Sequence, residues 1–306
     1  MKKLGIYFIT LSFITVSINL AWKFKPKMFK SHSQVSLSEK ISKSKYVRPP
    51  EIKYLWPNSL GELLINRHPL PKGFILTKVD SGSFEEWIRC LPLKPKGSPI
   101  FLFNGDKKIV QDLNAGVLDI DVGKTDLQQC ADAVIRLKAE YLYSNKKFTN
   151  INFNYTSGFK AEYSKWREGY KIVVKGNRVY YYKNPSITDK TYQGFRKYLW
   201  NVYNYAGTYS LNKELKKQST RNIKEGDVLI IGGFPGHVVM VAAVSQNSFK
   251  EKAVLLIQSY MPAQSIHIVK KQLTQGDGVW FKVSELEEKG WKTWEFDYTK
   301  EHLKTW

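Results

Sequence analysis

Residues 226–244 read GDVLIIGGFPGHVVMVAAV, two apolar runs separated by a turn rich in glycine. The runs Val228–Ile231 and His237–Val244 are short and bounded by Gly and Pro, which is typical of strands. Similar runs follow at Val254–Tyr260 and Val279–Val283. Because these runs are almost continuously apolar, we expect a meandering, mostly antiparallel sheet whose central strands are buried on both faces.

Helices are predicted before this sheet. Ser83 lies where a capping serine would begin a first helix. A second and stronger pattern runs from about Asp126 to Tyr143, is capped by Thr125 or Asp126, and places Cys130 on its apolar face. A third covers residues 190–206. Helices followed by a sheet indicate the α+β class.

Further strands are predicted outside the C-terminal sheet. Residues 100–103 and 117–122 flank an Asn-Gly-Asp turn, and residues 171–174 and 179–182 alternate in the manner of strands. We find no internal repeat, and therefore expect a single α+β domain over residues 51–306.

The N-terminus has the pattern of an export signal. Lys2 and Lys3 precede an apolar run from Leu4 to about Trp22. We expect residues 1–22 to be a signal peptide or an N-terminal membrane anchor, and leave these alternatives open. Residues 23–50 are rich in Lys and Ser and are predicted to be a polar linker. The folded domain is therefore expected in the periplasm or cell envelope.

Composition limits the class of partner. The net charge is +21, which favours polyanionic partners such as acidic cell-wall polymers. The Lys and Arg residues are dispersed, and neither zinc-finger spacing nor a phosphate-binding Walker loop is present, so no nucleic-acid partner is expected. The histidines show no metal-ligand spacing, and we expect neither a metal nor another cofactor.

The chain has two cysteines, Cys90 and Cys130, which excludes a small scaffold held by several disulfides. Three interpretations stay open: a single disulfide, two buried inert thiols, or one nucleophile.

Three residues have the order required for thiol catalysis. Cys130 lies near a helix start, which favours the thiolate, and a thiolate nucleophile needs a nearby base. His237 follows the glycine-rich turn and begins a buried strand, so its imidazole would be held at the edge of the sheet. Gln258, at the end of the next apolar run, could orient that imidazole. Packing of Cys130 in the core is the competing interpretation.

The motifs Gly226-Asp227-Val228 and Gly236-His237-Val238-Val239-Met240-Val241 resemble the histidine strand of papain-like cell-wall amidases such as the CHAP domains. The resemblance implies a papain-like fold, in which the helix carrying Cys130 packs on the C-terminal sheet or half-barrel. It also implies that Cys130, His237 and Gln258 hydrolyse an amide bond in peptidoglycan or a related peptide.

A second resemblance rests on longer motifs and covers the chain from about residue 60 onward. These motifs are LPLKP (91–95), DIDVG (119–123), DLQQCADAVIRL (126–137) and QSYMPAQ (258–264). They resemble an uncharacterised bacterial family, Domain of Unknown Function 4846. This second resemblance implies no activity.

Two other functions remain open. The chain could be a non-catalytic envelope protein that binds a cell-wall glycan or peptide. Alternatively, Asp119 and Asp121 would share one face of the strand predicted at 117–122. Paired carboxylates of this kind are used by glycosidases.

Overall fold

The computed structural model describes residues 45–56, 60–272 and 278–306. The predicted signal or anchor at 1–22 and the linker up to residue 44 lie outside this part. The end of the linker lies inside it: Tyr46 receives a hydrogen bond at its backbone oxygen from Asn66 and donates through its hydroxyl to Glu86 (2.8 and 2.6 Å). These bonds attach residues near Tyr46 to the folded unit. None of the helices in the described ranges has the length and apolar character needed to cross a bilayer.

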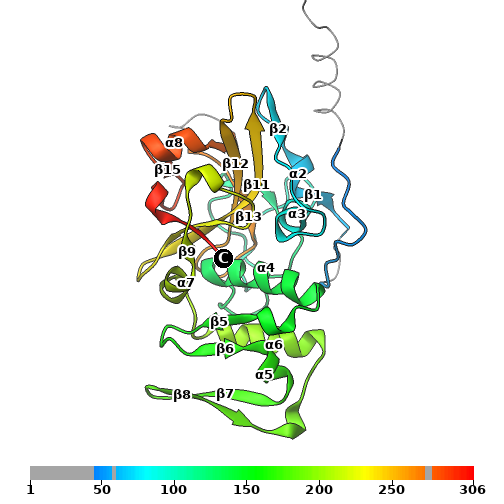
Figure 1. Ribbon diagram of the computed structural model, residues 1–306, viewed down its shortest axis with the longest axis vertical. Helices are drawn as coiled ribbons and strands as arrows, with labels where there is room; N and C mark the ends of the chain where they lie inside the picture. Colours follow the sequence, from blue (N-terminus) through cyan, green and yellow to red (C-terminus); the bar gives the residue numbers. More distant parts are fainter. Residues whose placement is uncertain (1–44, 57–59, 273–277) are drawn as a thin grey trace, which may run out of the picture. The chain divides into compact units, whose positions relative to one another are not determined.

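The elements alternate between short strands and helices (Figure 1). In chain order they are β1 Glu62–Leu63, α2 Leu64–Arg67, β2 Phe74–Leu76, α3 Phe84–Arg89, β3 Pro92–Leu93, β4 Asn114–Val117, α4 Cys130–Ser144, η1 Phe148–Asn150, β5 Asn152–Asn154, β6 Lys160–Glu162, α5 Tyr163–Arg167, β7 Tyr170–Lys175, β8 Arg178–Lys183, η2 Pro185–Ile187, α6 Tyr192–Tyr203, α7 Thr208–Glu214, β9 Lys216–Lys217, η3 Thr220–Asn222, β10 Val228–Ile231, β11 His237–Asn247, β12 Lys252–Gln258, β13 His267–Val269, β14 Trp280–Lys282, α8 Val283–Glu288, β15 Trp291–Lys292, β16 Asp297–Tyr298, η5 Lys300–His302 and β17 Leu303–Thr305.

One large antiparallel sheet organises the chain. Its strands lie in the order β4-β13-β12-β11-β10-β17-β9, with β14 also paired to β12 and β2 to β11. Val228 lies opposite Met240 in the β10–β11 pair, and Met240 lies opposite Ile257 in the β11–β12 pair. The predicted α+β class and the mostly antiparallel C-terminal sheet are therefore confirmed.

The central strand β11 is buried on both faces, as its apolar sequence predicted. Val238, Met240 and Ala242 belong to the larger hydrophobic core, which also contains the apolar residues of α3 and α4. Val239 and Val241 belong to a second core together with residues of α8, β14 and β15. Alternation along one strand thus divides the interior into two layers.

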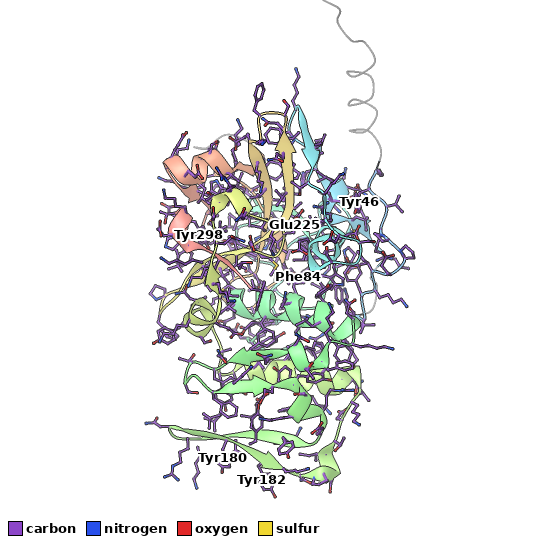
Figure 2. The ribbon with its side chains drawn as sticks, in the orientation of Figure 1. Tyr46, Phe84, Tyr180, Tyr182, Glu225 and Tyr298 are labelled. Carbon is purple, nitrogen blue, oxygen red and sulfur yellow. The ribbon has the colours of Figure 1, made fainter. Side chains whose placement is uncertain are left out.

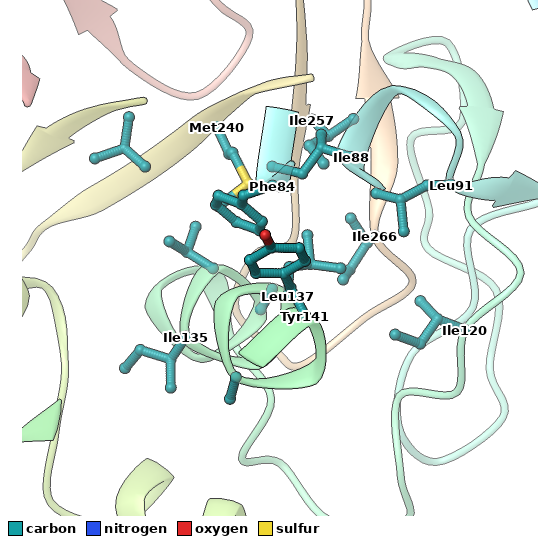
Figure 3. Packing of buried hydrophobic residues seen from close by; sticks show 14 of the residues in the cluster. Phe84, Ile88, Leu91, Ile120, Ile135, Leu137, Tyr141, Met240, Ile257 and Ile266 are labelled. Carbon is teal, nitrogen blue, oxygen red and sulfur yellow. The ribbon is translucent and has the colours of Figure 1, made fainter. Parts of the chain in front are cut away.

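Helix α4 packs across the sheet against β11 and β12. Figure 3 shows Leu137 and Tyr141 of α4 meeting Phe84 of α3 and Met240 of β11 in this layer. On its other side lie α5, α6 and the hairpins β5–β6 and β7–β8 (Figure 1). The 15-residue helix α4 is therefore enclosed between two groups of elements, and 12 of its residues are buried.

The β7–β8 hairpin confirms the strands predicted at 171–174 and 179–182. Figure 2 shows Tyr180 and Tyr182 on this hairpin, at the edge farthest from the large sheet. Both side chains are exposed.

The sequence placed several boundaries wrongly. The second helix begins at Cys130 instead of Asp126, because Asp126 Oδ1 accepts hydrogen bonds from the Ala263 amide and from Gln129 Nε2 (2.6 and 3.0 Å). The N-cap residue is instead Gln129, whose amide donates to Asp132 Oδ2 in the first turn of the helix (3.1 Å). The third helix is shorter than predicted and begins after Thr191, which accepts from the Gly194 amide.

Two predicted strands are also largely absent from the described chain. Residues 100–103 form only isolated bridges, at Phe101 and Leu102. In the segment 117–122, strand β4 ends at Val117, and Leu118 adds a single bridge to Leu93. The chain leaves the sheet after Leu118 because Asp121 is held by arginines of α4 and α6.

Candidate functional site

Antiparallel pairing brings His237 and Gln258 together. His237 is the first residue of β11 and Gln258 is the last residue of β12, so the two lie at the same end of neighbouring strands. His237 Nε2 and Gln258 Oε1 are 2.9 Å apart, a hydrogen-bond distance. Both side chains are buried.

The surroundings of Gln258 determine which of its amide atoms faces His237. His267 Nδ1 lies 3.1 Å from the Ser265 carbonyl oxygen, which can only accept, so this nitrogen carries the proton and His267 Nε2 is an acceptor. Gln258 Nε2 lies 3.3 Å from that acceptor and donates to Glu295 Oε2 at 3.0 Å. Two acceptors on one side therefore turn the Gln258 amide oxygen toward His237.

This orientation fixes the tautomer of His237. Because Gln258 Oε1 only accepts, His237 Nε2 carries the proton and Nδ1 carries the lone pair. Among the described residues, His237 Nδ1 is buried and has no hydrogen-bond partner. Burial lowers the pKa of His237, so the imidazole is neutral at pH 7.

Aromatic rings hold the imidazole in place. His237 stacks on Phe296, with ring centroids 4.9 Å apart and planes 18° apart, and meets the edge of Tyr260 at 5.1 Å. Lys108 pairs with Glu295 (3.2 Å), which closes the polar chain that begins at His237.

Cys130 lies beside the strand that carries His237. Burial raises the pKa of Cys130, and the backbone N–H groups of Ala131 and of Val238, the residue after His237, act on the sulfur in the opposite direction. Burial also raises the pKa of Tyr260, the ring that touches His237, and the charges of Glu295 and then of Cys130 act in the same direction.

The Cys130 thiol itself is weakly acidic. Burial is the largest influence and raises the pKa of Cys130 to about 11, with a further contribution from Asp132. Its exposed fraction is 6%, and it belongs to the larger core. Cys90 is fully buried, burial raises its pKa to about 12, and both thiols are free. A resting thiolate is therefore rare at either position.

A pocket of about 390 Å³ reaches Cys130. It lies between the start of α4, the end of α6 with the loop to α7, and the glycine-rich turn before β11. Gly236 in this turn is closely packed: a Cβ there would lie 2.6 Å from the Ile231 carbonyl oxygen. The glycine lets the turn approach α7 and delivers His237 to the sheet.

Comparison with known proteins assigns a family. Residues 64–305 match the family described as Domain of unknown function (4846). The chain belongs to this family. No curated protein and no solved structure matches the chain. The family description names no activity, so function has to be argued from the site.

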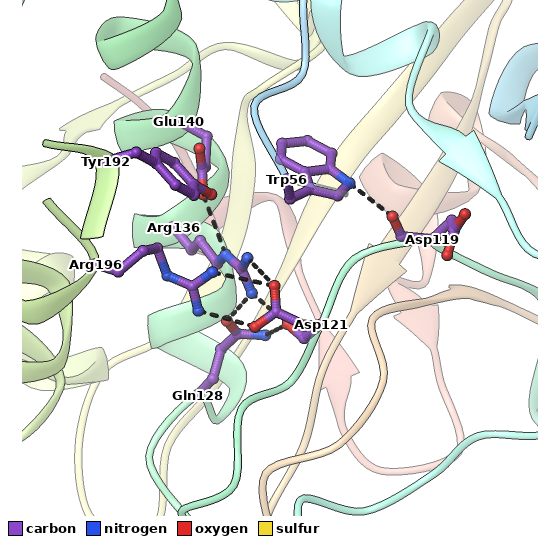
Figure 4. A network of polar contacts seen from close by, with 8 residues as sticks. All are labelled: Trp56, Asp119, Asp121, Gln128, Arg136, Glu140, Tyr192 and Arg196. Atoms are coloured by element: carbon purple, nitrogen blue, oxygen red, sulfur yellow. Dashed lines mark hydrogen bonds and ion pairs between the residues drawn. The ribbon is translucent and has the colours of Figure 1, made fainter. Parts of the chain in front are cut away.

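In this member of the family, Asp119 and Asp121 do not form a carboxylate pair on a strand. Asp121 binds Arg136 and Arg196 (2.6 and 2.9 Å), and the side chains of the two aspartates point away from each other (Figure 4). Although burial acts to raise the pKa of Asp121, the hydrogen bond from Arg196 and the charges of both arginines hold it well below its usual range. Asp121 is thus an ionised structural partner of two arginines.

Sequence reasoning missed His267, Glu295 and Phe296. His267 was considered only as a metal ligand, and in the described part of the chain no three His, Cys, Asp or Glu side chains are grouped to hold a metal ion. Its place on β13, paired with Gln258 in the sheet, could have been inferred from the strand order. Glu295 and Phe296 lie in a loop, where no periodic pattern marks them.

Proposed function

We propose that this protein is a thiol hydrolase that cleaves an amide bond in peptidoglycan or a related peptide of the cell envelope. Cys130 is the nucleophile, His237 the base and Gln258 the residue that orients the base. The proposal rests above all on the buried lone pair of His237 Nδ1, which has no partner in the described chain.

Leaving a buried acceptor unpaired is unfavourable by about 1–3 kcal/mol. His237 nevertheless has its other nitrogen held by Gln258, whose own orientation is set by Glu295 and His267. Such an arrangement serves a base that must accept a proton during a reaction. The Cys130 sulfur, which the Val238 backbone N–H influences, is the proposed source of that proton; in the described chain no hydrogen bond joins it to His237 Nδ1.

The chemistry follows from these roles. His237 Nδ1 takes the Cys130 proton as the sulfur attacks the substrate carbonyl carbon, and the carbonyl oxygen becomes an oxyanion. Backbone N–H groups at the start of α4 lack partners within the helix and lie beside the sulfur, where they can stabilise that oxyanion.

The tetrahedral intermediate then collapses and expels the amine, which takes the proton from His237. Water attacks the thioester that remains and gives a proton to His237. Loss of the acid returns that proton to the Cys130 sulfur.

The papain-like fold is part of the proposal. Its support is the order of parts along the chain: Cys130 begins a helix that packs on an antiparallel sheet, His237 begins a central strand, and Gln258 ends the next. The charge of +21 suits an acidic cell wall, and the apolar residues 1–22 suit export or membrane anchoring.

The test uses the folded protein and purified peptidoglycan, with products identified by mass spectrometry. The wild type is expected to release fragments with new amine and carboxyl ends, and Cys130→Ala to release none. Asp119→Asn is the matched control and should retain activity.

Release of fragments by Cys130→Ala would overturn the proposal, and new reducing sugar ends that disappear in Asp119→Asn would indicate a glycosidase. A wild type that binds peptidoglycan without cleaving it would be a binding protein.

A further inference from the structure

Two buried polar side chains at the pocket beside Cys130 each have an oxygen that lacks a hydrogen-bond partner among the described residues. Asp132 and Tyr203 both line it, and their exposed fractions are 6% and 5%. Within the described residues, Asp132 Oδ1 and the Tyr203 hydroxyl have no hydrogen-bond partner. Buried polar groups are nearly always paired, so two unpaired groups at one pocket call for an external partner.

The two groups also interact electrically. Burial raises the pKa of Tyr203, and the charge of Asp132, which lines the same pocket, acts in the same direction. Arg136 and Arg196 act on Tyr203 as well, but both are already paired with Asp121. Arg136 and Arg196 therefore already have an anionic partner outside the pair formed by Asp132 and Tyr203.

Asp132 has one satisfied oxygen and one free oxygen. Asp132 Oδ2 accepts from the Gln129 amide (3.1 Å), which caps α4. Burial raises the pKa of Asp132 well above its usual range, and only the backbone N–H groups of Gln129 and Asp132 act in the opposite direction among the described residues. A cationic hydrogen-bond donor reaching Oδ1 would supply both the missing charge and the missing bond.

We infer that Asp132 and Tyr203 form a subsite for a primary ammonium group of the substrate, adjacent to the bond that Cys130 attacks. This inference rests on the proposed function and specifies its substrate: a peptide with a free amine near the cleaved amide. An ammonium carries three donors, enough for the Asp132 carboxylate and the Tyr203 oxygen together.

Two sources of ammonium have the same chemistry, a peptide α-amino group and the side-chain amine of a diamino acid. Three probes separate them: alanyl-alanine amide, its N-acetylated form, and N-acetyl-lysine amide. Binding is measured by calorimetry on the full chain with Cys130→Ala, which prevents turnover.

We expect one of the two amines to bind and the acetylated dipeptide to bind at least about tenfold more weakly, because a charge-assisted bond is lost. Asp132→Asn should weaken binding of the amine by a similar factor, and Tyr203→Phe should weaken it less. The matched control is Asp126→Asn, since Asp126 lines the same pocket but already has partners in Ala263 and Gln129.

Binding of the acetylated dipeptide as tight as that of the tighter-binding amine would overturn the subsite, as would undiminished binding of that amine by Asp132→Asn. An effect of Asp126→Asn equal to that of Asp132→Asn would reduce it to general attraction of cations. Absence of binding by every probe would also overturn it and would show a pocket filled by water only. If the protein binds the amine but has no hydrolase activity, the proposed function is wrong and the ammonium subsite is retained.

Discussion

Replacement of His237 by glutamine gives the sharpest test of the thiol chemistry. The new amide keeps a donor for Gln258 but cannot take a proton at pH 7. With a pKa of about 11, roughly one Cys130 sulfur in 10,000 is a thiolate at pH 7. A positioned base contributes about 10²–10⁴-fold, so alkylation of Cys130 should slow by a factor in that range.

The assay is the rate of alkylation by iodoacetamide at each cysteine, followed by peptide mass spectrometry from pH 5 to 10. In His237→Gln, the rate at Cys130 should rise about tenfold per pH unit over most of this range, as expected for a free thiol. In the wild type it should level off above the lowered pKa of His237. Cys90, fully buried with a pKa of about 12, is the internal control and should react only on unfolding.

Identical pH profiles for wild type and His237→Gln would refute the role of His237 as the base. Equal rates at Cys130 and Cys90 in the folded wild type would refute an accessible nucleophile. Circular dichroism and the melting temperature show whether the variant is folded, so that a loss of structure is not mistaken for a loss of the base.

Three further predictions concern stability, each measured by urea unfolding. Burial lowers the pKa of His267 to about 4, so on acidification the unfolded state binds this proton before the folded state does. The free energy of unfolding should therefore fall by roughly 3 kcal/mol from pH 6.5 to 4. His267→Gln should flatten this pH dependence, and an unchanged slope would contradict the prediction. Gln258→Leu should destabilise the protein by about 1–3 kcal/mol, because it leaves the His237 N–H unpaired. A loss below about 1 kcal/mol would show that water replaces the amide. Arg89→Met should lower the free energy of unfolding by about 3–5 kcal/mol, because it leaves the buried Glu225 carboxylate without its ion-pair partner. Adding Glu225→Gln should recover part of that loss, and strictly additive losses would argue against a coupled pair.

Much of the fold could be predicted because the sheet is encoded locally. The runs at 228–231 and 237–244 are apolar without interruption, and such runs are stable only when both faces are covered. The hairpin at 171–182 was equally clear from its alternation. The segment 117–122 failed because its course depends on Asp121 binding Arg136 and Arg196, contacts between residues far apart in the sequence.

The candidate site, too, could be predicted only where local sequence patterns determine it. The pairing of β11 with β12 follows from local patterns. Once this pairing is assumed, His237 and Gln258 must lie at the same end of the two strands. The direction in which Gln258 points does not follow from those patterns, because it depends on Glu295 in a distant loop and on the proton carried by His267.

In the proposed mechanism, reactivity would therefore depend on a chain of proton positions rather than on three residue types. If Glu295 were replaced by a donor such as lysine, the Gln258 amide would be expected to rotate so that its oxygen accepts from that donor. The amide nitrogen would then face His237. His237 would then accept at Nε2 and carry its proton on Nδ1, the nitrogen that has to receive the proton of Cys130. A residue that touches neither sulfur nor substrate can in this way decide whether the base works, and motifs that specify only Cys, His and Gln cannot distinguish an active arrangement from an inactive one.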